Sequence, residues 1–292
     1  MIDQPLSDSE IKDFWENGYL CLKDAISQDQ LAAVRSDFDD WLKESKNHSD
    51  PFGITIDGRP RFDLQPGHSP ENPALRRVSS PIEVSDACLD VMRNSRAVDA
   101  IAQLIGPNVE FNNSKVNFKQ PGTSTKVDFH QDFVFQPHSN DDLIAVLISV
   151  DEMTLENGPL QVVPGSHRGP IFEHWHNGVF TGAVSKEVME EFGSESINIV
   201  AQPGTACFMH GRLLHGSAPN LSTGPRTLLI NEYRSEDAKP LDKNHIPSEM
   251  EGELVRGVVT NRVRSSDFEM AFPEYPTTAS FFDQQAKSSA GM

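Results

Sequence analysis

The sequence predicts a mainly β protein with flanking helices, built on a double-stranded β-helix of the jelly-roll, cupin-like type. About eight short strand-like segments, separated by turn residues, follow one another between residues 107 and 235. Helical periodicity is concentrated before residue 106. No linker-like run of Gly, Ser or Pro divides the 292 residues. We therefore expect one domain over 1–292, with a helical N-terminal part (about 1–106), the β-helix core (about 107–235) and a C-terminal extension (about 236–292).

Helices are predicted in three N-terminal stretches. Ser7 is the expected N-cap of the first, with Glu10 three residues later. Ser27 caps a longer helix, whose apolar residues recur at helical spacing. A further helical pattern runs from 83 to 105 and ends before a Gly-Pro pair.

Residues 46–80 are rich in Pro, Gly, Asp and Asn and lack sustained periodicity. Loops of this length in a compact domain are usually functional or disordered. We expect either a lid over an active site or a surface excursion. Residues 168–195 are predicted to be an insertion with a helix near its end, and they are the second candidate for a lid.

Strands dominate after residue 107. Residues 109–119 alternate, with Asn113, Lys115 and Asn117 on one face. Residues 143–150 form a nearly continuous apolar run, which is typical of a buried strand. Further strands are predicted at 159–163, 197–201, 205–209 and 227–233.

Composition narrows the range of partners. The net charge of −18 and the pI near 4.9 argue against nucleic acid and anionic membranes as partners, because such a surface repels phosphates. Three scattered cysteines without CxxC spacing indicate neither a disulfide framework nor a zinc site. The N-terminus lacks the pattern of a signal peptide, and no run is long enough to cross a bilayer. We expect a cytoplasmic protein that acts on a small molecule; monomer and homodimer both remain open.

Two distant segments carry potential metal ligands. His130 and Asp132 are two residues apart, and in an extended strand such residues project from the same face. Far downstream lie His210 and His215, followed by Arg226. Two imidazoles and one carboxylate, with open positions opposite, form the facial triad typical of non-haem Fe(II) enzymes that use oxygen. An arginine presents a fixed fork of donors suited to a carboxylate co-substrate.

With both segments in view, the chain resembles the phytanoyl-CoA dioxygenase family of Fe(II)- and 2-oxoglutarate-dependent oxygenases. The matching segments fall in order along the middle of the chain: Lys119–Gly122, Phe129–Asp132, Glu156–Leu160, Val163–His167, His215–Ser217 and Arg226.

This resemblance implies an assignment of the site. His130, Asp132 and His215 would bind Fe(2+), since the family's His-Gly-Ser pattern followed by an arginine matches His215. His210 follows an apolar Cys-Phe-Met run and fits a buried core histidine instead. Arg226 would bind the distal carboxylate of 2-oxoglutarate, with help from two further residues, Ser217 and Asn117. The third substrate would be O2.

The resemblance also implies the reaction. Halogenating relatives have Gly or Ala in place of the carboxylate, so Asp132 favours hydroxylation, with release of succinate and CO2. The proposed substrate-lining residues are Asn113, Lys115, Phe133, Phe135, Arg61 and Trp175.

Four readings of function compete. The polar candidates favour a small polar or anionic metabolite, whereas the aromatic candidates favour a larger apolar natural product or acyl-CoA. From another class, the chain could be a different cupin-like metalloenzyme that needs no keto acid, or a non-catalytic cupin-like binding protein. Arg226 and the complete triad argue against these last two.

Overall fold

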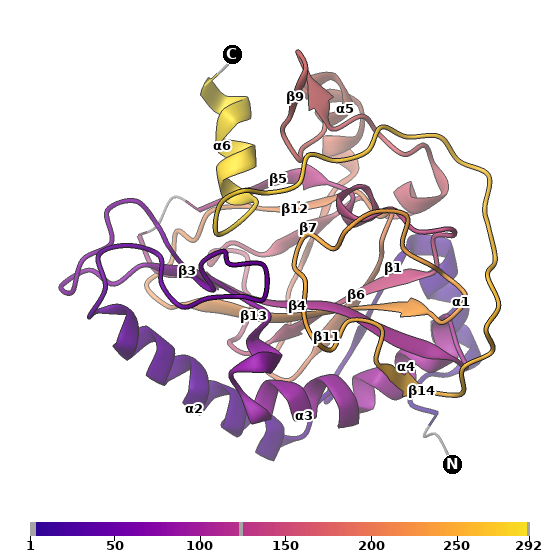
Figure 1. Cartoon of the computed structure of the whole chain (residues 1–292), viewed down its shortest axis with the longest axis horizontal. Coiled ribbons are helices and arrows are strands. Elements are labelled where there is room, and N and C mark those ends of the chain that lie inside the picture. Colours follow the sequence, from indigo (N-terminus) through magenta and orange to yellow (C-terminus); the bar gives the residue numbers. More distant parts are fainter. Residues whose placement is uncertain (1–3, 123–124, 291–292) are drawn as a thin grey trace.

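The computed structural model describes residues 4–122 and 125–290, and in these ranges the chain folds into two antiparallel sheets that face each other, with helices on one side (Figure 1). The larger sheet has the strand order β1-β11-β6-β13-β4-β3-β2, with β14 also pairing with β4. The smaller sheet has the order β10-β7-β12-β5, and β8 and β9 form a separate pair. This is the predicted jelly-roll architecture.

The strands have these bounds: β1 Tyr19–Leu22, β2 Phe62–Leu64, β3 Leu75–Ser79, β4 Val109–Lys119, β5 Val127–His130, β6 Leu143–Ser149, β7 Leu160–Val162, β8 Trp175–His176, β9 Val179–Phe180, β10 Ile197–Ile199, β11 Ala206–His210, β12 His215–Ser217, β13 Arg226–Ser235 and β14 Leu254–Arg256. The α-helices are α1 Asp8–Asn17, α2 Gln28–Ser45, α3 Asp86–Asn94, α4 Arg96–Leu104, α5 Lys186–Phe192 and α6 Phe282–Ala290. Short 3-10 helices lie at Pro81–Glu83, Asp132–Phe135, Ser166–Arg168 and Gly193–Glu195.

The first two helices begin as their sequences predict. Ser7 and Glu10 form a reciprocal capping box at α1, and Ser27 forms one with Gln30 at α2. The predicted helix over 83–105 is wrong in one respect, because the chain breaks at Ser95. The extended backbone of Ser95 ends α3 and caps α4, and both helices still bury their apolar faces in the same core.

Strand β6, an interior strand of the large sheet, is apolar throughout because both of its faces are buried. One set of alternate side chains, including Ile144 and Val146, packs against the N-terminal helices. The other set, including Leu147, packs between the two sheets with residues such as Val162 and Ile230. Helices α2, α3 and α4 cover the outer face of the large sheet, so the smaller sheet and the inter-sheet space lie on the opposite side (Figure 1).

Two stretches for which the sequence predicts no helix or strand do contain regular structure. The 46–80 stretch supplies β2 and β3, which extend the large sheet beyond β4. The C-terminal stretch supplies β14 and α6, and the segment between them runs around the body to bring α6 over β5 (Figure 1). Within the described ranges, none of the helices is both long and apolar enough to span a membrane.

Candidate active site

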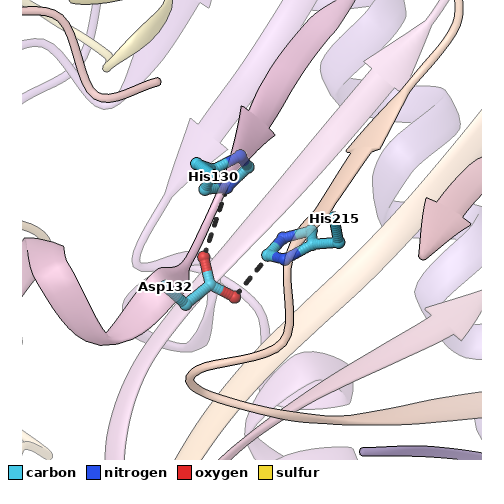
Figure 2. A group of neighbouring side chains, drawn as sticks. All are labelled: His130, Asp132 and His215. Carbon is cyan, nitrogen blue, oxygen red and sulfur yellow. Dashed lines mark ion pairs between the residues drawn. The ribbon is translucent and has the colours of Figure 1, made fainter. Parts of the chain in front are cut away.

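His130, Asp132 and His215 converge at one end of the small sheet (Figure 2). His130 ends β5 and is directly paired with His215, the first residue of β12. An Asp132 carboxylate oxygen lies 3.5 Å from His130 Nε2 and the other lies 3.7 Å from His215 Nε2. One ligand atom from each residue lies within 4.8 Å of the others. A single ion can therefore contact all three.

Glycine between His215 and Ser217 permits this close approach of the two strands. A Cβ at Gly216 would lie 2.8 Å from the Phe129 ring and 2.8 Å from the Val127 carbonyl oxygen. Any larger residue there would push β12 away from β5 and separate the two histidines.

Backbone hydrogen bonds fix the imidazoles in the form that suits a metal. His130 Nδ1 donates to the Asp128 carbonyl at 2.8 Å, and His215 Nδ1 donates to the Leu213 carbonyl at 2.9 Å. Each Nε2 is then left with its lone pair facing Asp132. Burial, together with His130, lowers the pKa of His215 to about 4, so its ring is neutral at pH 7.

The backbone at Asp132 is not the extended strand that the sequence predicts. It begins a 3-10 helix and does not continue β5. Because Gln131 keeps an extended backbone, the two ligands still project to the same side. Burial alone raises the pKa of Asp132, but His215 and Lys115 hold it well below its usual range. Two imidazoles and one ionised carboxylate are the donor set that suits Fe(II).

A second feature of the site is a pair of buried basic residues. Arg226 begins β13 and lines the same cavity as the triad. Its Nε donates to the Gly158 carbonyl at 3.1 Å, and within the described ranges no carboxylate lies in ion-pairing distance of it. Lys119 donates from Nζ to Ser217 Oγ at 2.7 Å and to the Ala218 carbonyl.

Lys119 and Arg226 together form a site that suits a dianion. Burial, with help from Arg226, lowers the pKa of Lys119 to about 5, and burial lowers the pKa of Arg226 to about 10. An incoming carboxylate would stabilise the charge on both groups. Asn117 lines the cavity as well, and its Oδ1 is buried without a hydrogen-bond partner. Lys119 belongs to one of the family motifs, but nothing in the residues around it indicates that it would bind the co-substrate.

The rival histidine lies elsewhere. His210 is buried against Trp15 and His167, with ring centroids 5.9 and 5.1 Å away. Its Nδ1 accepts from the Arg212 backbone N–H at 3.1 Å. His210 therefore occupies a packed position outside the metal cavity, whereas His215 is part of it.

The predicted substrate residues divide into two groups. Lys115 lines the cavity and forms a buried ion pair with Glu232 at 2.8 Å, and Asn113 donates to the same carboxylate. The ring centroid of Phe135 lies 5.6 Å from that of His130.

Three other candidates are held by structural contacts. Arg61 donates to the backbone carbonyls of residues 54, 79 and 80 and pairs with Glu83 at 2.6 Å. Phe133 is fully buried and packs against Phe268, with ring centroids 5.2 Å apart. Trp175 donates to the Phe272 carbonyl and packs on Phe180, away from the metal cavity.

The cavity is closed by neither of the two predicted lids. Phe281 and Phe282, at the start of α6, line it directly, and the Phe281 ring centroid lies 5.8 Å from that of His130. Gln285 holds this segment in place by accepting from the Asp128 backbone N–H and donating to the Gly182 carbonyl. The space left around the triad is about 50 Å³. This closure could not be predicted from the sequence, because two aromatic residues in a weakly patterned tail do not specify where they pack.

Comparisons with known proteins agree with this geometry. Residues 14–228 match the family model of phytanoyl-CoA dioxygenase (PhyH). A probable alpha-ketoglutarate-dependent hypophosphite dioxygenase of Stutzerimonas stutzeri is 32% identical over 235 residues, covering 79% of each chain. An L-proline trans-4-hydroxylase of Streptomyces griseoviridis is 29% identical, covering 69% of this chain and 85% of its own. The crystal structure of apo EctD from S. alaskensis superposes with a TM-score of 0.68 at 21% identity, covering 90% of this chain and 89% of that one.

The jelly roll, the triad and the buried arginine define a non-haem iron, 2-oxoglutarate-dependent dioxygenase. The chain belongs to the phytanoyl-CoA dioxygenase family.

Proposed function

We propose that this dioxygenase hydroxylates a C–H bond of a small polar or anionic metabolite. The observation that carries the proposal is the cavity around the triad. It is confined to about 50 Å³ by Phe281 and Phe282, and its floor includes the charged Lys115. Lys115 is paired with Glu232, and a polar ligand can add hydrogen bonds to this buried pair, whereas an apolar ligand can add none.

Each residue has a distinct part in this scheme. His130, Asp132 and His215 would hold Fe(2+), which with 2-oxoglutarate and O2 supplies the oxidising chemistry when bound. Arg226 would bind the distal carboxylate through its two terminal nitrogens, since its Nε is engaged by Gly158.

Supporting residues complete the co-substrate site. Lys119 would contribute a second positive charge on binding, and Ser217 and Asn117 would position the keto acid between Arg226 and the metal. Burial of these groups also excludes water from the reacting atoms.

The relatives support a small substrate. Hypophosphite, proline and ectoine are the substrates in the names of three similar dioxygenases, at 32%, 29% and 25% identity. The phytanoyl-CoA dioxygenase of Rattus norvegicus, which has an acyl-CoA in its name, is 25% identical. The larger apolar substrate is thus the second candidate, and the apolar cavity wall that includes Leu147 and Ile230 is the observation in its favour.

The test is substrate-dependent succinate release. The purified protein is incubated with iron, 2-oxoglutarate and O2 against a panel of small amino acid derivatives, organophosphonates and reduced phosphorus oxyanions, with terpenoid and acyl-CoA compounds as the second arm. The proposal expects succinate in proportion to a product from the first arm and none from Asp132→Ala. Turnover of the second arm alone would reject the small substrate, and turnover without 2-oxoglutarate would reject the co-substrate assignment.

A further inference from the structure

Arg77 on β3 is a buried cation that has no hydrogen-bonding or ion-pairing partner among the described residues. Four arginines are buried in the described part of the chain: Arg61, Arg77, Arg226 and Arg234. Arg61 and Arg234 form ion pairs, and Arg226 donates to a backbone carbonyl in the co-substrate site. Arg77 is only 2% exposed, and in the described residues its guanidinium has neither a hydrogen bond nor an ion pair. A buried arginine usually binds a carboxylate or phosphate, so this arrangement indicates a missing ligand.

The nearest carboxylates do not fill this gap. Asp63 and Glu232 stabilise the charge of Arg77 from a distance. Asp63, however, is held by Arg76 at 2.7 Å and by a serine hydroxyl at 2.7 Å. Glu232 is held by Lys115 and by Asn113, each at 2.8 Å. Both carboxylates compensate the charge without using the donors of Arg77.

Aromatic rings connect Arg77 to the metal site. The guanidinium carbon lies 4.9 Å from the Phe281 ring centroid and 6.0 Å from that of Phe282. Phe281 in turn lies 5.8 Å from the His130 ring and lines the cavity. Stacking on a ring covers one face of a guanidinium and leaves its in-plane donors free. Phe281 thus stands between an available cation and the metal ligands.

Two further buried polar atoms, on His245 and Asn113, have no hydrogen-bond partner in the described part of the chain. His245 packs against Phe135 with ring centroids 5.4 Å apart, and its Nδ1 has no hydrogen bond. The charges of Lys115, Arg77 and Asp132 all act on His245, which places it among the groups around the metal. Asn113 Oδ1 is also buried without a partner. Several buried polar atoms without partners close to a metal site are typical of a binding site that lacks its ligand.

We propose that Arg77 binds the oxyanion group of the substrate, a carboxylate, phosphonate or phosphinate, with His245 as a second donor. Phe281 and Phe282 cover this position when substrate is absent, and the anion displaces them. The inference rests on the proposed function and adds the substrate's charged group and its receptor. Arg226 and Arg77 then have equivalent tasks, one for the co-substrate and one for the substrate.

An anion can displace Phe281 from Arg77 because its interaction with the guanidinium is the stronger of the two. A two-pronged, charge-assisted hydrogen bond in a buried site is stronger than stacking of a cation on phenylalanine. Phe281 must therefore compete with the anion, and its removal should tighten anion binding. Removal of the Arg77 charge should weaken it.

The experiment measures binding by isothermal titration, without turnover. Protein loaded with Mn(II) and N-oxalylglycine, which fills the 2-oxoglutarate site, is titrated with methylphosphonate, acetate or the neutral comparator acetamide. We expect the protein to bind one of the two anions and not acetamide, and which anion it binds distinguishes a phosphonate from a carboxylate substrate. Arg77→Gln should raise the dissociation constant of that anion by about 30-fold or more, and Phe281→Ala should lower it several-fold.

Controls separate this inference from the proposed function. Arg61→Gln removes a buried arginine whose donors are already occupied, so it should leave anion affinity within about twofold of wild type. Binding of Mn(II) and N-oxalylglycine should be unchanged in Arg77→Gln. If wild-type protein binds neither anion, or if Arg77→Gln binds it as tightly as wild type, the inference is wrong. If wild-type protein does not bind N-oxalylglycine, the proposed function fails instead. Phe281→Ala keeps the test decisive if Arg77→Gln does not fold.

Discussion

Replacement of Arg226 by glutamine is the perturbation that bears most directly on the use of 2-oxoglutarate. The side chain is 2% exposed, and Gly158 engages its Nε, which leaves both terminal nitrogens for a carboxylate. Removal of one partner from a buried, hydrogen-bonded charge pair costs about 2–5 kcal/mol. Glutamine keeps one donor, so we expect the lower half of that range, about 2–3.5 kcal/mol. The dissociation constant of 2-oxoglutarate should therefore rise by about 30- to 400-fold.

The assay is anaerobic isothermal titration of 2-oxoglutarate into protein loaded with Mn(II). Arg212→Gln serves as the matched control, because Arg212 is partly buried, pairs with Asp141 at 2.9 Å and does not line the cavity. The control should bind 2-oxoglutarate like wild type, and both variants should bind Mn(II). Affinity for 2-oxoglutarate within about threefold of wild type in Arg226→Gln would refute the assigned role of this arginine.

Three further predictions concern the ligands, protonation and the core. Mn(II) binding, followed by titration calorimetry, should be lost in His215→Ala and retained in His210→Ala; the reverse result would make His210 the ligand. Because Lys119 has a pKa of about 5 in the free protein, binding of a dianion at pH 7 should restore its charge and take up about one proton. Affinity should then fall by at most about tenfold per pH unit above that pKa, and binding heats that do not depend on the buffer would contradict this. Phe14→Ala should lower the free energy of unfolding in urea by about 3–5 kcal/mol without changing Mn(II) affinity, because Phe14 is fully buried beneath the large sheet.

Local patterns were sufficient to predict most elements of the fold. The strand over 109–119 has the predicted bounds, because its alternation reflects two distinct environments. Asn113 and Lys115 face Glu232, while Val116 belongs to the core beneath the helices. The capping serines also begin their helices where expected, since a cap depends on residues only three positions apart.

The features that the sequence did not predict depend on contacts between segments far apart in the chain. β2 and β3 form because the edge of β4 offers hydrogen bonds, and nothing in the Pro-rich 46–80 stretch indicates that edge. Arg61 was proposed as a substrate residue on its charge alone, but Glu83 and three carbonyls occupy it. The closure by Phe281 depends on a tail that crosses the molecule to reach β5. Pairings between distant segments cannot be read from local periodicity.

The ligand set could be proposed from sequence because family motifs preserve its spacing, although the conformation that joins the ligands differs from a simple strand. Asp132 lies in a 3-10 helix, yet the extended Gln131 before it keeps the carboxylate beside His130. By contrast, Lys119 and Arg77 stand out only when burial and missing partners are known.

The central claim is that three side chains from two distant segments hold one divalent metal beside the 2-oxoglutarate site. Anomalous diffraction at the manganese edge, from crystals grown anaerobically with Mn(II) and 2-oxoglutarate, tests it most directly. We predict a single strong peak between the Nε2 atoms of His130 and His215 and the carboxylate of Asp132, with keto-acid density reaching Arg226. A peak at His210 and His167, or keto-acid density away from Arg226, would contradict the account.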